Sequence, residues 1–478
     1  MAIETHKLIK NTTIYAAGDI VPRLLAFASL PILGNYLSTE QYGVVSYVNA
    51  LLLVLSIVGY LSLNTYYLVF YGRQKDDQAR GKLLGNLTFF VGGVNVIFVV
   101  LMLIFGPWFF ELIGSSIDFY PYLALAVLTH LANTFAVFPS ALYRMQERPL
   151  LFTVLNSAKG VLQLGVMALL VVGFSWQAQG VLWANLIVAA IFAVVFVMLT
   201  RRETIFCINW AQIRVALRFS LPLLPGAIAY YLILMFDRVL IDHFLGLNDV
   251  GIYSMAANLA MVLNILSYGA YKAFEPHFFK IYGTADFGQH FAKVRDAFVF
   301  VMLVGVTGLS LFGREFFQLM TSAAYSTSYL YVPLILIGVY AAGLAMLYNT
   351  IVTARGKTHI ISGVNIVGAI VSVALNVWLL PRWGVVAAPL ASGSALVVIL
   401  LLDIHYSGLR VKHGNVIGAS LFAGLVIWIA VYLLPMEGFW LPLAIKGVIF
   451  VVTNLITMRI LGLTFSSIYR SIVPKANP

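Results

Sequence analysis

Charged side chains and cysteine are both scarce in this sequence of 478 residues. Only 10% of the residues are charged, whereas soluble domains carry about 25%, so the composition excludes a soluble globular protein. The single cysteine, Cys207, excludes an internal disulfide and leaves no thiol-based redox motif. The sequence also lacks a Gly-rich Walker loop and any His, Cys, Asp and Glu cluster with metal spacing. We therefore expect neither ATP hydrolysis within this chain nor a cofactor or metal site.

Long apolar runs are abundant instead, since 61% of the residues are hydrophobic. A spanning helix needs roughly 20 mostly apolar residues, and such runs recur to the end of the chain. The short alternating segments of a transmembrane β-barrel are not seen. The sequence thus predicts an all-α integral membrane protein with about fourteen spans. They lie near residues 11–34, 41–71, 83–106, 118–139, 150–173, 177–200, 216–242, 249–271, 293–312, 327–350, 360–380, 384–405, 416–434 and 441–462.

Lys and Arg fall almost entirely on one side of this topology. With the N-terminus in the cytoplasm, 22 of the 29 basic residues lie in cytoplasmic segments and 5 lie inside spans. Only Arg314 and Arg382 lie outside. This positive-inside bias predicts that both termini are cytoplasmic. It also accounts for the net charge of +11 without a nucleic-acid partner.

The two halves of the chain resemble each other. Residues 37–55, LSTEQYGVVSYVNALLLVL, match residues 245–263, LGLNDVGIYSMAANLAMVL, at an offset of 208 that pairs Gly43 with Gly251. Spans 1–6 then correspond to spans 7–12, so the predicted divisions are an N-lobe (1–205), a C-lobe (206–410) and an appended pair of spans with a cytoplasmic tail (411–478). Two parallel six-helix repeats form a cavity between them, which favours a transporter.

Ionisable residues at bilayer depth cost about 2.5–3.5 kcal/mol each to insert, so they are candidates for function. Helical spacing places them on three faces together with other polar residues. These faces are Tyr15, Asp19 and Arg23 in span 1; Asn156, Lys159 and Gln163 in span 5; and Tyr231, Arg238 and Asp242 in span 7, with Asp237 adjacent. Pro22 and Pro31 in span 1, and Pro222 and Pro225 in span 7, favour bends there.

Uncharged polar residues form further stripes, namely Asn49, Tyr60 and Asn64 in span 2, Asn258 and Tyr268 in span 8, and Asn365 in span 11. These line a cavity or hold helices together by hydrogen bonds, and the sequence favours neither interpretation. Asp19 with Arg23, and Asp237 with Arg238, can likewise be functional groups or structural ion pairs. His130 in span 4 is interpreted as a packing residue rather than a proton relay. Lys446 and Arg459 are expected to extend toward lipid head groups.

Cations slightly outnumber anions among the intramembrane residues of the repeat, and tyrosine is abundant at 25 residues. Lys and Arg form charge-assisted hydrogen bonds with phosphate. Tyrosine offers an apolar face and a hydroxyl to a sugar. The composition of the predicted cavity therefore favours an anionic ligand that contains a sugar.

Two segments, one in each half, resemble a known family. Residues 11–47 contain a Leu-Pro before a helix end, followed by Leu-Ser-Thr-Glu-Gln-Tyr-Gly, and residues 217–254 contain Leu-Pro-Leu-Leu-Pro, Asp237-Arg238 and Gly-Ile-Tyr-Ser. This pattern resembles Wzx-type polysaccharide flippases of the multidrug/oligosaccharidyl-lipid/polysaccharide exporter superfamily. The resemblance covers roughly the first 410 residues, and it implies two MATE-like six-helix lobes around a central cavity.

The resemblance implies that an O-antigen-like oligosaccharide, carried on undecaprenyl pyrophosphate, moves across a bacterial inner membrane by alternating access. An H⁺ or Na⁺ gradient is the implied energy source, and a polysaccharide polymerase and a chain-length regulator are implied partners besides membrane lipids. By position, Arg23, Lys159 and Arg238 would hold the pyrophosphate. Asp19, Asp237 and Asp242 would then act as a switch, because an aspartate can compete with the pyrophosphate for these cations.

Two alternatives remain open. A MATE-like multidrug antiporter would share the fold but favour acidic groups for a cationic drug. A membrane polymerase or glycosyltransferase would need a large outer loop or a catalytic cluster. The predicted outer loops are short, and their charged residues stand singly: Glu40, Glu111, Asp118, Asp249, Arg314, Glu315, Arg382 and Glu437.

Overall fold

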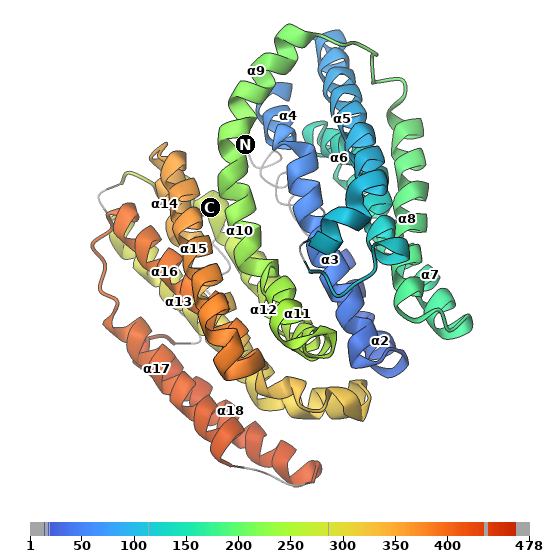
Figure 1. The fold of residues 1–478 in the computed structure, drawn as a ribbon. Helices are drawn as coiled ribbons and strands as arrows, with labels where there is room; N and C mark the ends of the chain where they lie inside the picture. Colours follow the sequence, from blue (N-terminus) through green and yellow to red (C-terminus); the bar gives the residue numbers. More distant parts are fainter. Residues whose placement is uncertain are drawn as a thin grey trace. The chain divides into compact units, whose positions relative to one another are not determined.

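A computed structural model describes residues 14, 18, 20–112, 114–284, 286–434 and 438–464. Within these residues every regular element is a helix (Figure 1), which confirms the predicted all-α class. Twelve segments are long and apolar enough to cross a membrane. One of them, His359–Ser407, contains two helices, and a shorter apolar helix, Ile20–Tyr36, precedes them all. With the two helices of His359–Ser407 counted separately, these segments and the shorter helix correspond in order to the fourteen predicted spans, the first of which begins partly outside the described residues.

Contacts within the chain define two compact units, Met1–Gly251 and Ile252–Pro478. The predicted division near residue 205 rests on similarity between the halves, which these contacts do not test. The α-helices that lie in the first unit, or begin there, are α2 (Leu30–Tyr36), α3 (Thr39–Tyr60), α4 (Leu63–Tyr71), α5 (Asp77–Leu112), α6 (Ala124–Met145), α7 (Pro149–Ala168), α8 (Gln177–Thr200), α9 (Trp210–Ser220), α10 (Leu224–Met235), α11 (Asp237–Leu245) and α12 (Leu247–Ile281). Short helical turns extend three of them, namely η1 (Phe119–Leu123), η2 (Leu169–Gly173) and η3 (Leu221–Leu223).

The second unit continues with α13 (Phe287–Met320), α14 (Val332–Ala354), α15 (Thr358–Trp383), α16 (Ala387–Ser407), α17 (Gly414–Trp428) and α18 (Trp440–Ile460). Its short turns are η4 (Ala323–Tyr325), η5 (Ser328–Leu330), η6 (Gly384–Val386) and η7 (Ile429–Leu433). Within this unit α16 packs against α14 and α15, while the hairpin of α17 and α18 packs against α13.

Three predicted spans are interrupted. The first has a turn at Ser29, two residues before Pro31. The seventh is divided by η3, which contains Pro222, and again at Phe236 between α10 and α11. These three breaks lie in the two spans where prolines indicated bends. The second span also breaks, because Leu61 and Ser62 adopt left-handed backbone conformations with φ of 51° and 54°, and no proline marks this site.

Two glycines that the sequence repeat pairs lie against each other's helices. A Cβ on Gly43 would be 2.0 Å from the carbonyl oxygen of Leu247, and a Cβ on Gly251 would be 1.8 Å from that of Thr39. Thr39 and Leu247 are themselves separated by the repeat offset of 208. The contact is reciprocal, as in an isologous interface formed about a two-fold axis. Only glycine permits so close an approach of α3 and the start of α12.

Tyrosine contributes heavily to one buried core in the first unit. Tyr66, Tyr67 and Tyr71 of α4 pack with leucines of α5 and with Phe138 of α6. These rings fill the space between helices, since each is almost fully buried. Part of the high tyrosine content therefore stabilises the helix bundle.

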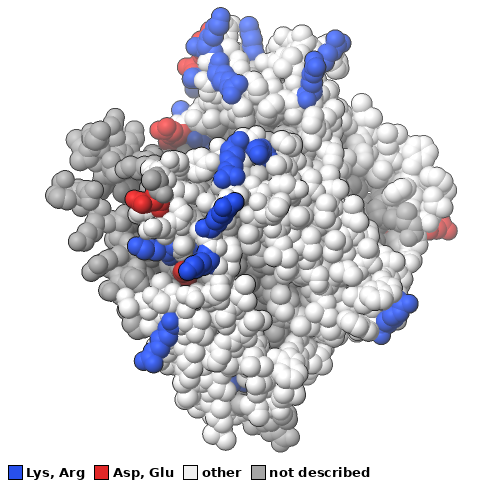
Figure 2. Space-filling model, turned by 90° about the vertical axis from the view of Figure 1, so that its left-hand side faces the viewer, with Lys and Arg blue, Asp and Glu red and all other residues white. Residues whose placement is uncertain are grey.

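Many large apolar side chains are exposed, including Leu112, Met198, Leu421 and Trp440. In a protein with this many apolar spans, such a surface faces lipid. Figure 2 shows one face of the molecule, where wide areas carry no charged side chain and Lys and Arg outnumber Asp and Glu. The chain is accordingly a multi-pass membrane protein.

Within the second unit, a buried ion pair joins the C-terminal hairpin to α13. Lys446 Nζ of α18 lies 2.6 Å from Glu315 Oε1 of α13, and the two side chains are 6% and 5% exposed. Two turns further along both helices, Asn454 Nδ2 donates a hydrogen bond to Thr307 Oγ1 at 3.1 Å. The expectations that Lys446 reaches lipid head groups and that Glu315 lies in an outer loop are wrong, because each side chain neutralises the other inside the protein.

Candidate functional site

Five polar side chains join four helices inside the first unit, and we call them the amide network: Asn49, Asn133, Lys159, Gln163 and Asn185. Lys159 Nζ of α7 donates to Asn133 Oδ1 of α6 at 3.1 Å. One turn along α7, Gln163 Nε2 donates to Asn185 Oδ1 of α8 at 2.8 Å. Asn185 Nδ2 in turn donates to Asn49 Oδ1 of α3 at 3.3 Å. All five side chains are half-buried.

Helix geometry explains why these residues meet. Lys159 and Gln163 are four residues apart, which places both on one face of α7. That face is turned toward α6 and α8, both of which pack against α7. Lys159 supplies the network with its positive charge, while the amide groups offer both donors and acceptors. Such a set of groups is able to bind an anion together with hydroxyl groups.

A second polar cluster surrounds His130 of α6, which is fully buried. Its Nε2 lies 2.6 Å from Asn95 Oδ1 of α5. Asn95 Nδ2 donates to the carbonyl oxygens of Gly59 and Val91, so Asn95 Oδ1 is the acceptor and His130 Nε2 carries the proton. The Tyr60 ring lies 5.6 Å from the imidazole. This arrangement fits the interpretation of His130 as a hydrogen-bonded packing residue.

Arg238 and Asp237 form an ion pair with each other at the start of α11. Arg238 Nη1 lies 2.9 Å from Asp237 Oδ1 and also donates to the carbonyl oxygen of Leu234 at 3.1 Å. Both side chains are buried. Asp242, on the same helix, accepts a hydrogen bond from Ser116 Oγ at 2.5 Å. Both aspartates therefore have partners within the first unit, and a ligand that binds Arg238 has to compete with Asp237.

Arg23 is exposed and lies on the helix that packs against α7. A Cβ on Gly160 would be 3.4 Å from Pro22 Cα, and Thr153 Oγ1 donates to the carbonyl oxygen of Ile14 at 2.7 Å. Pro22 precedes Arg23 and Gly160 follows Lys159, so each cation is one residue away in the chain from this helix–helix contact. Tyr15 and Asp19 lie outside the described residues.

The remaining predicted lining residues are half-buried, and they divide between the two units. Asn64, Asn156 and Tyr231 belong to the first unit and Asn258, Tyr268 and Asn365 to the second. Tyr268 has the Lys272 ammonium 5.5 Å from its ring centroid. Their assignment to a binding site stays a prediction.

Two members of the amide network, Asn133 and Asn185, were missed by the sequence reasoning. An isolated asparagine in an apolar helix gives a weak signal, because such residues often satisfy interhelical hydrogen bonds. The only signal for Asn185 is that it is the one amide side chain in the otherwise apolar residues 180–190. Within the described ranges no group of three or more His, Cys, Asp or Glu residues is placed to hold a metal ion.

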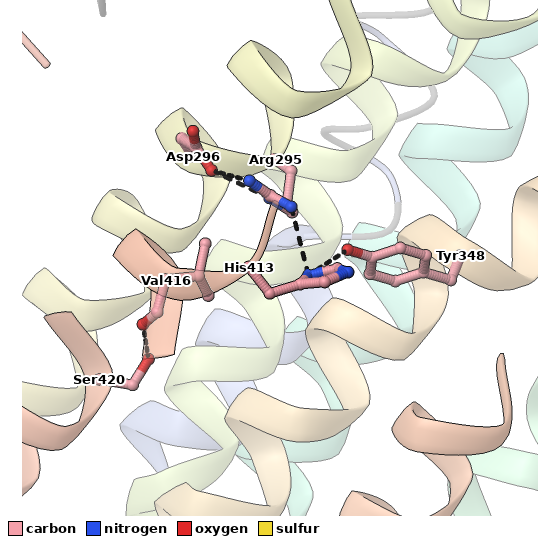
Figure 3. A network of polar contacts seen from close by, with 6 residues as sticks. All are labelled: Arg295, Asp296, Tyr348, His413, Val416 and Ser420. Atoms are coloured by element: carbon pink, nitrogen blue, oxygen red, sulfur yellow. Dashed lines mark hydrogen bonds and ion pairs between the residues drawn. The ribbon is translucent and has the colours of Figure 1, made fainter. Parts of the chain in front are cut away.

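A polar cluster in the second unit connects α13, α14 and the start of α17 (Figure 3). Arg295 donates to Asp296 Oδ1 through Nε at 2.9 Å and through Nη2 at 2.7 Å. Arg295 Nη1 lies 3.3 Å from His413 Nδ1, which the Tyr348 hydroxyl approaches to 3.5 Å. Burial and then the Arg295 charge lower the pKa of His413 from its ordinary value, with Asp296 opposing them. The imidazole is therefore neutral and accepts at Nδ1.

Comparisons with known proteins agree with this architecture. The family described as "Polysaccharide biosynthesis protein" matches residues 8–282. Lsg locus putative protein 1 of Haemophilus influenzae is 25% identical over 287 residues, which cover 57% of this chain and 66% of that protein. An uncharacterized membrane protein of the same organism is 21% identical over 281 residues, covering 57% and 65%. The matched region thus spans just under two thirds of these relatives' length.

Solved structures show the same fold. The lipid II flippase MurJ in its inward closed conformation has a TM-score of 0.76 at 13% identity, covering 96% of this chain and 99% of that one. A multidrug resistance MATE family transporter of the MOP superfamily, in an inward-facing conformation, has a TM-score of 0.64 at 13% identity, covering 82% and 97%. The expected MATE-like fold and the resemblance to the flippase superfamily are confirmed. The chain belongs to the family of polysaccharide biosynthesis proteins.

Proposed function

We propose that this protein is a flippase for an oligosaccharide linked to undecaprenyl pyrophosphate, such as an O-antigen unit of lipopolysaccharide. It would move this lipid from the cytoplasmic to the periplasmic leaflet of a bacterial inner membrane by alternating access, with both termini in the cytoplasm. The family membership and the fold support a transporter of this superfamily rather than an enzyme. A polysaccharide polymerase and a chain-length regulator are the proposed partners.

The observation that carries the proposal is the position of Lys159. Its ammonium lies inside the first unit with a neutral amide oxygen of Asn133 as its hydrogen-bond acceptor. A pyrophosphate oxygen is a stronger acceptor for an ammonium than an amide oxygen, because charge-assisted hydrogen bonds are shorter and stronger. The amides of Gln163, Asn185 and Asn49 continue the polar path and suit sugar hydroxyls.

Arg238 takes a second role in this scheme. It is paired with Asp237 in the structure, and a pyrophosphate group would displace that carboxylate. This exchange of partners would shift the equilibrium between two conformations of the protein. A ligand shifts such an equilibrium through its differential affinity for the two states. Arg23 would contribute from the neighbouring helix, and an H⁺ or Na⁺ gradient would drive the cycle.

Complementation of a deletion strain tests the proposal. Lys159→Ala removes a charge-assisted hydrogen bond that contributes about 1.5–3 kcal/mol, so glycan export should fall by roughly 10- to 150-fold. Lys82→Ala changes an exposed lysine of α5 and serves as the matched control, with export unchanged. Export at the wild-type level in Lys159→Ala would show that the assignment is wrong. Loss of drug resistance rather than of surface glycan in the deletion strain would favour the multidrug antiporter.

A further inference from the structure

One carboxyl group of the second unit is buried without a partner. Asp403 of α16 is 1% exposed, and among the described residues neither Oδ1 nor Oδ2 has a hydrogen-bond partner. Other buried carboxyl groups differ in this respect. Asp237 contacts Arg238, Asp242 contacts Ser116, and Glu315 contacts Lys446. Asp403 therefore calls for a separate explanation.

The charged and titratable residues near the C-terminal end of α16 either contact groups other than Asp403 or are exposed. Tyr348 of α14 directs its hydroxyl toward His413, and the Arg355 guanidinium lies against Gly408 after the end of α16. His359 of α15 and His405 of α16 are exposed. One turn after Asp403, the Ser407 hydroxyl donates to the carbonyl oxygen of Ile404. Within the described part of the chain, none of these groups forms a hydrogen bond with the Asp403 carboxyl oxygens.

An ionised carboxylate is expensive to bury without a cation or hydrogen-bond donors, whereas the neutral acid is not. The C-terminal end of a helix carries a partial negative charge, which disfavours a second negative charge nearby. Asp403 is buried one turn before the end of α16 at Ser407, so both effects favour the protonated, neutral form of its carboxyl group.

We propose that Asp403 is a proton-binding site within the second unit. Asp403 holds a proton as the neutral carboxylic acid while α14 and α15 cover it. When water reaches the helix end, the O–H bond breaks, the proton passes to water and the carboxylate remains; uptake reverses this step. That the bound proton is also the coupling ion rests on the proposed transport function.

Infrared spectroscopy of the full-length protein in lipid bilayers tests the site directly. The carbonyl stretching band of protonated carboxyl groups should contain a component at neutral pH that Asp403→Asn removes. Asp118→Asn makes the same chemical change at an exposed position and should leave the component in place. In the wild type this component should fade as pH rises. The proposal is overturned if Asp403→Asn gives the wild-type band, or if the component does not change with pH.

Two further measurements keep the test decisive. If Asp403→Asn does not fold, Asp403→Glu should retain the acid component at a shifted frequency, and an unshifted band would refute the assignment. In reconstituted vesicles, an imposed pH gradient should accelerate lipid flipping by the wild type but not by Asp403→Asn. An unchanged gradient response in the variant refutes the coupling role. If neither the wild type nor Asp403→Asn flips the lipid, the proposed transport function is refuted. The proton-binding site is still supported if the infrared component is present in the wild type.

Discussion

The buried pair of Lys446 and Glu315 provides a quantitative prediction about the C-terminal hairpin. Lys446→Met removes the cation that lies 2.6 Å from Glu315 and leaves a carboxylate that is 5% exposed. The second oxygen of Glu315 already lacks a hydrogen-bond partner among the described residues. Removing one member of a buried ion pair costs about 3–5 kcal/mol. We therefore expect the free energy of unfolding to fall by about that amount.

Reversible unfolding of the purified protein in lipid bicelles measures this change. The double substitution Lys446→Met with Glu315→Gln should restore most of the stability, because it removes both charges together. Arg80→Met disrupts a pair of nearly equal length, 2.8 Å to Asp77, at the surface and should change stability little. A loss below about 1 kcal/mol for Lys446→Met, as for an exposed pair, would refute the inference that this pair holds the hairpin.

Three further predictions follow from other contacts. Gly43→Ala should destabilise the protein by about 1–3 kcal/mol, because the new methyl group would lie 2.0 Å from the Leu247 carbonyl oxygen. The melting temperature should fall accordingly, and an unchanged value would contradict that close approach. Because the pKa of His413 is lowered in the folded state by burial and Arg295, stability should decrease as pH falls below the unfolded-state value of about 6.5. His413→Gln should flatten that slope in thermal unfolding at several pH values, and an equal slope in the variant would argue against this linkage. Asn95→Leu should lower the free energy of unfolding by about 1–3 kcal/mol, because it leaves the buried His130 N–H without its acceptor. A free energy of unfolding equal to that of the wild type would show that this hydrogen bond is not needed.

Hydropathy predicted the spans well because each needs only a local run of apolar residues. Partners within the bundle were harder to predict, since they are far apart in the chain. Lys446 and Glu315 are 131 residues apart, and Asn185 and Asn49 are 136 apart. The repeat offset did anticipate one distant relation, because it pairs Gly43 with Gly251 and these glycines contact each other's helices.

The candidate site was predicted in part. Lys159 stood out because an intramembrane charge is rare, but its partner Asn133 did not. The high tyrosine content was interpreted as a signal for sugar binding, yet Tyr66, Tyr67 and Tyr71 pack in a core. Composition does not separate these roles, because a tyrosine ring serves equally as an apolar filler and as a sugar-binding surface.

Direct observation of lipid flipping by the purified protein is the most direct test of the central claim. Vesicles containing the protein and an undecaprenyl-pyrophosphate-linked oligosaccharide would be treated with an enzyme that cannot cross the bilayer and cleaves only the outer-leaflet glycan. The account predicts that nearly all of the lipid becomes cleavable with the wild type, whereas Lys159→Ala leaves the inner-leaflet half protected over the same time. Equal cleavage in vesicles with and without the protein would contradict it.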